Sequence, residues 1–272
     1  MANFDLDAYL ARIDFAGPRV ATRATLEALH ALHPSAIAFE NVDVLLGIPI
    51  SLELGAITDK LVHRRRGGYC YEHNLLFAAA LRSLGFEVTG LIARVIYGAR
   101  SDAVTARSHM LLEVTAEDEA YFADVGFGGL SLTAPLSAST RLPQRTSHET
   151  FRVSTFNREI ALEAELRSGW QPLYRFDLQR QEPIDYELAN HWSSTHKSAY
   201  FTRSLVAGLV QPGVRYGLVD NTLSTRPTGA ESELRTIDEP DELRNVLSQT
   251  FGIELPTGAA IDALLAERVR RR

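Results

Sequence analysis

The chain has 272 residues, of which 45% are hydrophobic and 23% are charged, and its formal net charge is -6 at pH 7. These values are typical of a globular protein. Cys70 is the only cysteine, which excludes an intramolecular disulfide framework and the zinc and iron–sulfur sites that need several thiolates. Cys70 is therefore either a small buried side chain or a reactive group, and we predict no metal site.

Charge and hydropathy narrow the function classes further. A mildly acidic chain lacks the basic surface of a nucleic-acid-binding protein. No run of about 18 apolar residues is present, so we expect no membrane span. The opening segment MANFDLDAYL lacks the basic start and the long apolar run of a secretory signal. We therefore expect a cytoplasmic protein that binds neither nucleic acid nor a membrane, and we leave its oligomeric state open.

The first part of the chain has helical periodicity. Apolar spacing predicts helices over residues 4–13, 22–32, 58–63 and 70–84. Thr22 and Thr58 are suitable N-caps, and Gly85 is a suitable residue to end the last helix. We expect residues 1–85 to form a helical bundle that carries Cys70.

The pattern changes to short strands after Gly85. Alternating apolar residues predict strands over 85–98, 108–114, 120–129, 151–155, 159–164 and 172–177. The AEDEA segment is a turn between the second and third of these strands. We expect residues 86–190 to form a strongly bent sheet or small barrel of about six strands.

The remaining residues, 191–272, combine both patterns. We predict a helix over 198–205, strands over 214–219, 222–224 and 234–237, and helices beginning near Pro240 and Gly258. This part is interpreted as an α/β lid. The predicted fold class is therefore α+β, with three domains.

Cys70 lies where a thiol gains reactivity. Gly67 and Gly68 allow a sharp turn into the predicted helix, whose first turn holds the sulfur. The free N–H groups and the positive end of the helix dipole favour a thiolate there and can receive a developing oxyanion. A lone cysteine is more often simply buried, so its neighbours decide between the two interpretations.

His109 and Asp124 are the best partners for such a thiol. They lie on the two strands that flank the AEDEA turn, and in half of the possible registers both side chains lie on one face of the hairpin. The carboxylate then fixes the imidazole tautomer and stabilises the imidazolium. In chain order the three residues give Cys, His and Asp.

Several motifs resemble the arylamine N-acetyltransferases. The segment from Arg66 to Asn74 matches the RGGxCxExN signature of that family in full, and Asp124 begins a DVGFG motif. IAFEN at 37–41 resembles IPFEN, and STH at 194–196 followed by Phe201 resembles STHPxSxF. Lys197 and Ala199 depart from the last motif, where the family has proline and serine. The resemblance covers roughly residues 5–255.

The resemblance implies an activity and its residues. Cys70 is the implied acetyl acceptor, His109 the base and Asp124 its orienting partner, in a core like that of the cysteine proteases. The family transfers acetyl groups from acetyl-coenzyme A to arylamines, arylhydrazines or arylhydroxylamines by a ping-pong route through acetyl-cysteine. Acetyl-coenzyme A is thus a substrate, and no tightly bound cofactor is implied.

The resemblance also implies binding residues. Aromatic positions that match the acceptor cleft of the family are Phe39, Tyr71, Phe127 and Phe201, although core packing also accounts for such rings. Positions implied for coenzyme A are Thr105, Gly126, Gly128, Gly129 and Trp192.

Three alternatives stay open from the sequence. The same triad suits an amide synthase of natural-product assembly or a papain-like thiol hydrolase. A non-enzymatic small-molecule binding protein with an inert, buried Cys70 is the third. The sequence does not name the physiological amine.

Overall fold

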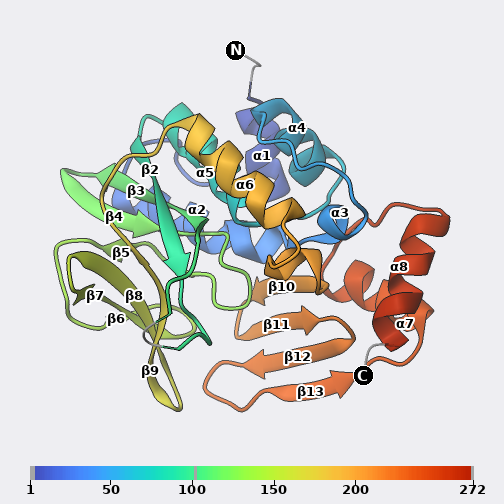
Figure 1. Ribbon diagram of the computed structural model, residues 1–272. Helices are drawn as coiled ribbons and strands as arrows, with labels where there is room; N and C mark the ends of the chain where they lie inside the picture. The colour runs from blue at the N-terminus through green and yellow to red at the C-terminus, as the bar shows by residue number, and fades with distance from the viewer. Residues whose placement is uncertain (1–3, 101–102, 271–272) are drawn as a thin grey trace.

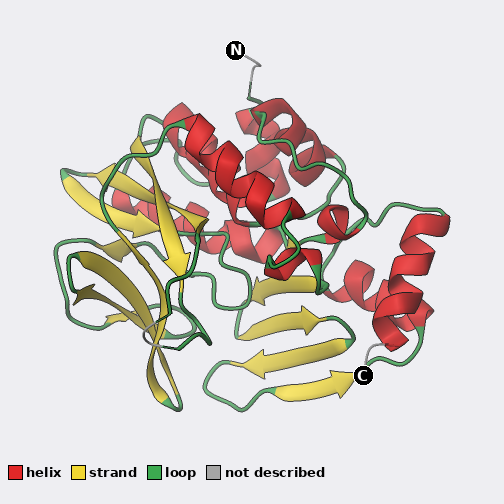
Figure 2. Cartoon of the chain, in the orientation of Figure 1, coloured by secondary structure: helices red, strands yellow, loops and turns green. Residues whose placement is uncertain are grey.

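The computed structural model describes residues 4–100 and 103–270. Helices gather in the upper part of the molecule and strands form two separate sheets below them, with two further helices beside the second sheet (Figures 1 and 2). This arrangement confirms the predicted α+β class. No helix in the described ranges is long and apolar enough to cross a membrane.

The helical part begins with four helices that precede most of the strands. Their bounds are α1 (Leu6–Arg12), α2 (Arg23–Ala36), α3 (Val42–Leu45) and α4 (Leu54–Thr58), which continues as a π-helical turn η1 (Asp59–His63). The Thr22 hydroxyl accepts the Thr25 N–H and caps α2, as predicted. Thr58 is not an N-cap, because α4 begins earlier and the Thr58 hydroxyl donates to the Leu54 carbonyl within it.

Helix α5 (Cys70–Ser83) carries the predicted thiol at its first position. Gly85 follows it with a φ of 93°. The Phe86 N–H bonds to the Leu81 carbonyl and the Gly85 N–H to the Arg82 carbonyl, which is the Schellman arrangement. The helix therefore begins and ends where the sequence predicts, with Cys70 fixed at its N-terminus.

An eight-stranded antiparallel sheet follows, in the order β5-β4-β3-β2-β9-β8-β7-β6. Its strands are β2 (Glu87–Val95), β3 (Arg107–Ala116), β4 (Glu119–Ala123), β5 (Leu136–Ser137), β6 (Gln144–Arg145), β7 (Thr150–Phe156), β8 (Glu159–Leu166) and β9 (Gly169–Phe176). The sheet curls until β5 meets β7. Our estimate of about six strands was too low, because the two-residue strands β5 and β6 are too short to show an alternating pattern.

A second, five-stranded sheet has the order β1-β10-β11-β12-β13. Its strands are β1 (Phe39–Glu40), β10 (Val206–Gln211), β11 (Val214–Val219), β12 (Thr222–Pro227) and β13 (Glu233–Thr236). Helices α7 (Pro240–Asn245), its π-helical continuation η3 (Val246–Thr250), and α8 (Ala259–Arg270) pack against it. Strand β1 comes from the helical part and pairs with β10, which the sequence analysis did not predict.

The predicted helix over 198–205 was wrong. The chain instead forms α6 (Pro183–Thr195), a short 3-10 turn η2 (Tyr200–Thr202) and then β10. Pro183 starts α6, and the Asp185 carboxylate accepts the Glu182 N–H, so the start signal was present. Apolar side chains on the exposed face of α6 concealed its amphipathic pattern.

Helix α6 lies across the front of the helical part and contacts β3 and the turn η2 that leads into β10 (Figure 1). It passes through position 190, where we placed the end of the second domain. The division into 1–85, 86–190 and 191–272 stays a prediction.

A chain of buried side chains ties α1, α2 and α5 together. The Tyr9 hydroxyl lies 2.9 Å from His33 Nδ1, His33 Nε2 lies 2.9 Å from His73 Nδ1, and His73 Nε2 lies 3.1 Å from the Ala38 carbonyl. Because a carbonyl only accepts, His73 donates from Nε2 and accepts at Nδ1. His33 must then donate from Nε2 and accept the Tyr9 hydroxyl at Nδ1, so the proton of each hydrogen bond in this series is assigned. Both imidazoles must be neutral to complete it.

These buried histidines predict a loss of stability in acid. Burial lowers the pKa of His73 and of a third buried histidine, His30, to about 4, and holds the pKa of His33 well below its ordinary value. The unfolded chain therefore binds more protons than the folded chain below about pH 6.5. The free energy of unfolding should fall by up to about 1.4 kcal/mol per pH unit for each histidine as the pH drops from 6.5 towards 4.

Urea denaturation at several pH values measures this dependence. His73→Gln cannot titrate, so the variant should lose stability less steeply over the same range. A free energy of unfolding that is constant between about pH 6.5 and 5 would contradict the neutral, buried state of these side chains.

Candidate active site

Cys70 is the first residue of α5 and is almost completely buried. Its sulfur faces β3 and lies 3.7 Å from the Ser108 carbonyl oxygen. The Glu72 carboxylate accepts the Tyr69 N–H at 3.0 Å, which caps the helix just before the thiol. The helix start and the capping contact thus fix where the sulfur lies.

The turn before Cys70 approaches β1 so closely that only glycine fits. A Cβ atom on Gly67 would lie 2.0 Å from the Ala38 carbonyl oxygen. The next residue, Gly68, bridges to Phe39, and its carbonyl accepts the Glu40 N–H at 2.7 Å. The glycines of the signature therefore let the nucleophile turn lie against β1.

A buried network of five charged side chains holds the same turn. Arg66 contacts Glu40 and Asp43 at 2.7 and 2.9 Å, and Lys60 contacts Asp43 and Glu72 at 2.8 Å each. Burial alone would raise the pKa of Asp43, but Lys60 and Arg66 outweigh it and lower that pKa. Arg66, adjacent to the glycines, is therefore a structural tie and not part of a solvated face.

His109 and Asp124 lie on one face of the β3–β4 hairpin. Leu112 pairs with Ala123, so Asp124 falls diagonally opposite His109, as one class of the predicted registers requires. His109 Nε2 lies 2.7 Å from Asp124 Oδ2, and both side chains are buried. The AEDEA segment supplies the turn, with φ values of 52° at Glu117 and 63° at Asp118.

Asp124 is a buried carboxylate with several donors. Besides His109, it accepts the Asn74 amide at 3.1 Å and the Gly126 N–H at 2.9 Å, both on Oδ1. Burial would raise the pKa of Asp124, but the His109 charge and these hydrogen bonds lower it. The carboxylate is therefore ionised at neutral pH.

The ionised Asp124 sets the charge of His109. Burial would lower the pKa of the imidazole, but the attraction of Asp124, their hydrogen bond and an interaction with Cys70 raise it to about 10. Since Nε2 is bound to Asp124, Nδ1 is the nitrogen left for the thiol. The structure thus brings Cys70, His109 and Asp124 together with a protonated imidazole in the middle.

The aromatic rings near the triad form two groups. Phe127 and Tyr174 pack against His109 with ring centroids 5.2 and 4.9 Å away. In the second group, the Phe201 ring centroid lies 5.7 Å from those of both Phe39 and Tyr69. Tyr71, which packs edge-on against Tyr69 at 5.5 Å, is completely buried. The four predicted acceptor-site rings therefore fall into two groups, Phe127 in the first and the other three in the second.

The positions implied for coenzyme A have different surroundings. A Cβ on Gly126 would lie 2.9 Å from the Cys70 Cα, so this glycine is already required for packing. Gly128 has a φ of 81°, and a Cβ on Gly129 would meet no atom within 4 Å. Thr105 precedes β3 with its hydroxyl buried and unpartnered among the described residues.

Trp192 lies on the exposed face of α6 and stacks on His196 with centroids 5.5 Å apart. In the loop that follows, Lys197 is exposed and Ala199 is buried, and the Ala199 N–H bonds to the His196 carbonyl at 2.8 Å. The loop therefore closes a turn without the proline and serine of the family motif.

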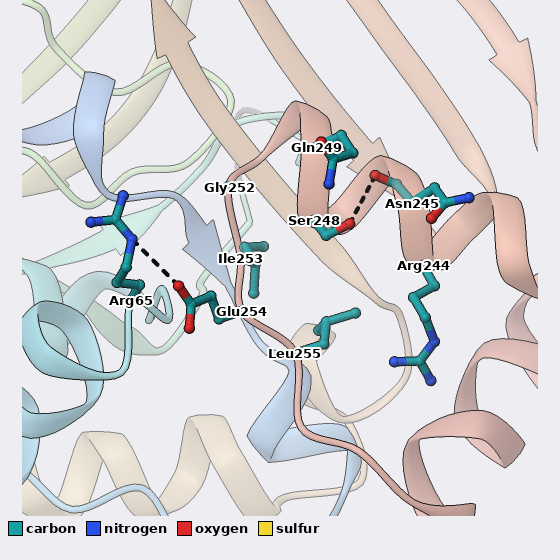
Figure 3. Close-up of a pocket in the computed structure, with 9 residues that line it drawn as sticks. All are labelled: Arg65, Arg244, Asn245, Ser248, Gln249, Gly252, Ile253, Glu254 and Leu255. Carbon is teal, nitrogen blue, oxygen red and sulfur yellow. Dashed lines mark hydrogen bonds and ion pairs between the residues drawn. The ribbon is translucent and has the colours of Figure 1, made fainter.

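A shallow pocket of about 420 Å³ lies beside Arg65 (Figure 3), and no triad residue lines it. Its other lining residues come from the segment 244–255. Arg65 contacts Glu254 through its side chain at 3.5 Å, and its carbonyl accepts the Glu254 N–H at 3.3 Å. The C-terminal part of the chain thus holds the start of the nucleophile turn.

Two residues of the site had no role in the sequence analysis. Asn74 donates to Asp124 and to the Met110 carbonyl. It lies four residues after Cys70, and this spacing could have predicted that both side chains share one face of the helix. Tyr174, from β9, contacts His109 by its ring, and nothing local in the sequence indicates this. Within the described ranges, no group of three or more His, Cys, Asp or Glu side chains is arranged for a metal ion.

The two lysines of the chain allow a matched test of the buried network. Lys60→Met leaves Asp43 and Glu72 without their shared cation, so the free energy of unfolding should fall by about 3–5 kcal/mol. Lys197→Met changes an exposed side chain and should alter it by less than about 0.5 kcal/mol. Urea denaturation of both variants measures the difference, and equal effects would contradict the structural role of Lys60.

The charge of His109 predicts the reactivity of Cys70. Iodoacetamide should label Cys70 rapidly at about pH 6, where an ordinary thiol is almost entirely protonated. His109→Gln keeps a polar side chain but carries no charge, so it should slow labelling at that pH by at least about tenfold. Labelling rates followed by mass spectrometry measure the effect, and an unchanged rate would show that the imidazolium does not activate the thiol.

The chain is similar to known proteins over nearly its whole length. The family model described as N-acetyltransferase matches residues 22–260. The arylamine N-acetyltransferase of Mycolicibacterium smegmatis is 39% identical over 269 residues, which cover 97% of this chain and 98% of that protein. An arylamine N-acetyltransferase / N-hydroxyarylamine O-acetyltransferase of Salmonella typhimurium is 37% identical over 249 residues, 91% of this chain and 88% of that protein.

Solved structures agree with the sequence relatives. The Mycobacterium marinum arylamine N-acetyltransferase in complex with CoA is 36% identical, with a TM-score of 0.92 over 97% of this chain and 98% of that one. The M. smegmatis arylamine N-acetyltransferase gives a TM-score of 0.94 at 38% identity over 98% of this chain and 100% of that one. These findings confirm the resemblance noted in the motifs: the chain is an acyltransferase that belongs to the arylamine N-acetyltransferase family.

Proposed function

We propose that this chain transfers the acetyl group of acetyl-coenzyme A to arylamines, arylhydrazines or arylhydroxylamines through an acetyl-Cys70 intermediate. The observation that carries the proposal is the 2.7 Å pair of Asp124 with His109, whose pKa is raised in part by the interaction of the imidazole with Cys70 at the N-terminus of α5. The Mycobacterium marinum relative in complex with CoA supports the donor, and the names of the relatives support the acceptors.

In the first half-reaction the Cys70 thiolate attacks the thioester carbonyl. A carbon–sulfur bond forms to Cys70, and the carbonyl oxygen gains charge near the free N–H groups of the first turn of α5. The bond to the coenzyme A sulfur then breaks, and the leaving thiolate takes the proton of the His109 imidazolium. The products are free coenzyme A, acetyl-Cys70 and a neutral imidazole.

In the second half-reaction the neutral His109 acts as the base. The amine nitrogen attacks the acetyl-Cys70 carbonyl, and its proton passes to the imidazole. The acetylated amine leaves, and the Cys70 thiolate and the His109 imidazolium are restored. One imidazole serves both half-reactions because Asp124 binds Nε2 and stabilises the charged ring, while the proton on Nδ1 can still move to and from the reacting groups.

The aromatic rings around the triad suit a flat acceptor. Phe127 packs directly on His109, so a ring bound beside Phe127 would hold its amine close to the base. We propose Phe39, Phe201 and Tyr71 for the opposite wall, where the buried Tyr71 acts through its packing on Tyr69.

For coenzyme A we propose Thr105, Trp192 and the glycine turn of Gly126, Gly128 and Gly129. Open space at the Gly129 Cβ position lets a ligand approach the backbone closely. We also propose a cytoplasmic location, because a reducing compartment keeps a reactive free thiol such as Cys70 from oxidation.

Mass spectrometry and transfer assays test the proposal directly. With acetyl-coenzyme A alone, the chain should gain a single acetyl group on Cys70 and release a stoichiometric burst of coenzyme A. Cys70→Ala should abolish both the burst and the transfer to an aniline or an aryl hydrazine. Cys70→Ser is the matched control, since it keeps the shape but replaces the thiolate with a poor nucleophile, and it should lose nearly all transfer.

Two outcomes would refute the assignment. Transfer that survives in Cys70→Ala would remove the acetyl-cysteine intermediate. No burst with acetyl-coenzyme A, together with hydrolysis of peptide amides, would favour the thiol hydrolase that the same triad allows.

A further inference from the structure

A histidine outside the triad bonds to the main chain of Asp124. His30 lies on α2, far from Asp124 in the sequence, and its Nε2 accepts the Asp124 N–H at 3.1 Å. The imidazole is completely buried and packs edge-on against Phe77 with centroids 5.7 Å apart. It touches the residue that orients His109 but not the reacting thiol.

The bond fixes the protonation state of His30. A backbone N–H only donates, so Nε2 must be bare and the single proton of the neutral ring lies on Nδ1. Nδ1 is buried and has no hydrogen-bond partner among the described residues. An unpaired buried donor lowers stability, so an apolar residue of similar size would suit α2 better. Packing alone therefore does not account for a histidine here.

The carboxylate of Asp124 depends on the turn that carries it. Strand β4 ends at Ala123, and three successive N–H groups of the following turn are each held by a different acceptor. His30 accepts the first, from Asp124; Asn74 Oδ1 accepts the second, from Val125, at 3.2 Å; Asp124 Oδ1 accepts the third, from Gly126, at 2.9 Å. His30 provides the one contact of this set that comes from α2.

We propose that His30 is a positioning residue that, as a neutral acceptor, holds the Asp124 peptide so that the carboxylate meets His109. The proposal rests on the proposed function, in which Asp124 orients the imidazole that serves Cys70. Without the Nε2 acceptor the Asp124 N–H would be buried and unpaired, and the turn would rotate to satisfy it. Such a rotation moves the carboxylate and the 2.7 Å bond to His109 with it.

Charge also requires that His30 stay neutral. A protonated ring would lose its acceptor and would place a second cation beside Asp124, in competition with His109. The other titratable groups near it are Asp124 itself and His33 on α2, which is neutral and bonds in turn to the neutral His73 of α5. Burial lowers the pKa of His30 to about 4, so the acceptor persists through the neutral range.

Two amide variants separate positioning from packing. In His30→Gln the side-chain oxygen reaches the place of Nε2, so the Asp124 N–H keeps an acceptor. In His30→Asn the same group is one methylene shorter and cannot reach it. His30→Gln should retain the rate of Cys70 alkylation at pH 6 and of single-turnover acetylation within about threefold, whereas His30→Asn should lose on the order of tenfold to a hundredfold in both.

His30→Leu tests the proposal independently if His30→Asn does not fold. It removes the unpaired Nδ1 proton but leaves the Asp124 N–H unpaired instead, so its stability to urea should stay close to that of the wild type, yet it should be as slow as His30→Asn. In the wild type, a scalar coupling through the N–H···N bond between Asp124 and His30 should appear in nitrogen-labelled NMR spectra. Its absence would overturn the contact itself.

His33→Asn is the matched control on the same helix. Its shorter amide cannot reach the place of Nε2, so it loses the bond to His73 and should lower stability, but folded protein should alkylate Cys70 at the wild-type rate. The proposal is overturned if His30→Leu or His30→Asn reacts like the wild type, or if His33→Asn slows the reaction as much. Cys70→Ala tests the proposed function separately, because its retained transfer would refute the triad whatever the His30 variants show.

Discussion

The site depends on a charged carboxylate that has no access to water. Asp124 is completely buried, and an isolated ionised carboxylate in such a place would take up a proton. It stays charged because His109 from β3, Asn74 from α5 and the Gly126 N–H of its own turn all donate to it. Satisfying this group forces the helical part and the eight-stranded sheet to meet at one point.

Helix α5 joins that point to a second buried charge cluster. Cys70 and Asn74 are one turn apart and share the face that meets β3 and Asp124. Glu72 points to the other face, where it caps Tyr69 and pairs with Lys60. Within this one helical turn, Cys70 and Asn74 therefore face the triad, whereas Glu72 faces the charged network that anchors the helix.

The anchoring face in turn fixes the thiol. Lys60 and Arg66 hold Glu40, Asp43 and Glu72 with the nucleophile turn between them. Breaking the Lys60–Glu72 or the Arg66–Glu40 pair leaves a buried carboxylate without a cation, so the turn has little freedom to move the sulfur away from His109.

Local patterns predicted the elements that carry the triad. The start of α5, its end at Gly85 and the β3–β4 hairpin follow from capping, turn chemistry and alternation, which act over a few residues. The pairing of β1 with β10 and the contacts of Tyr174 and His30 join segments distant in sequence, and their energy appears only after folding. Helix α6 was missed because its exposed apolar residues disguise which face is buried.

Asp124 shows how one residue sets two histidines to opposite charge states in the same core. Its carboxylate offers only acceptors, so His109 gains a proton and its pKa rises to about 10. Its main-chain N–H offers only a donor, so His30 must present a bare nitrogen, and burial lowers the pKa of that ring to about 4. Both imidazoles are buried, so desolvation alone would make both neutral. The difference arises from which atom of Asp124 each ring faces. His109, which faces the carboxylate, is the ring that carries the additional proton, and this proton can move between the imidazole and the thiol.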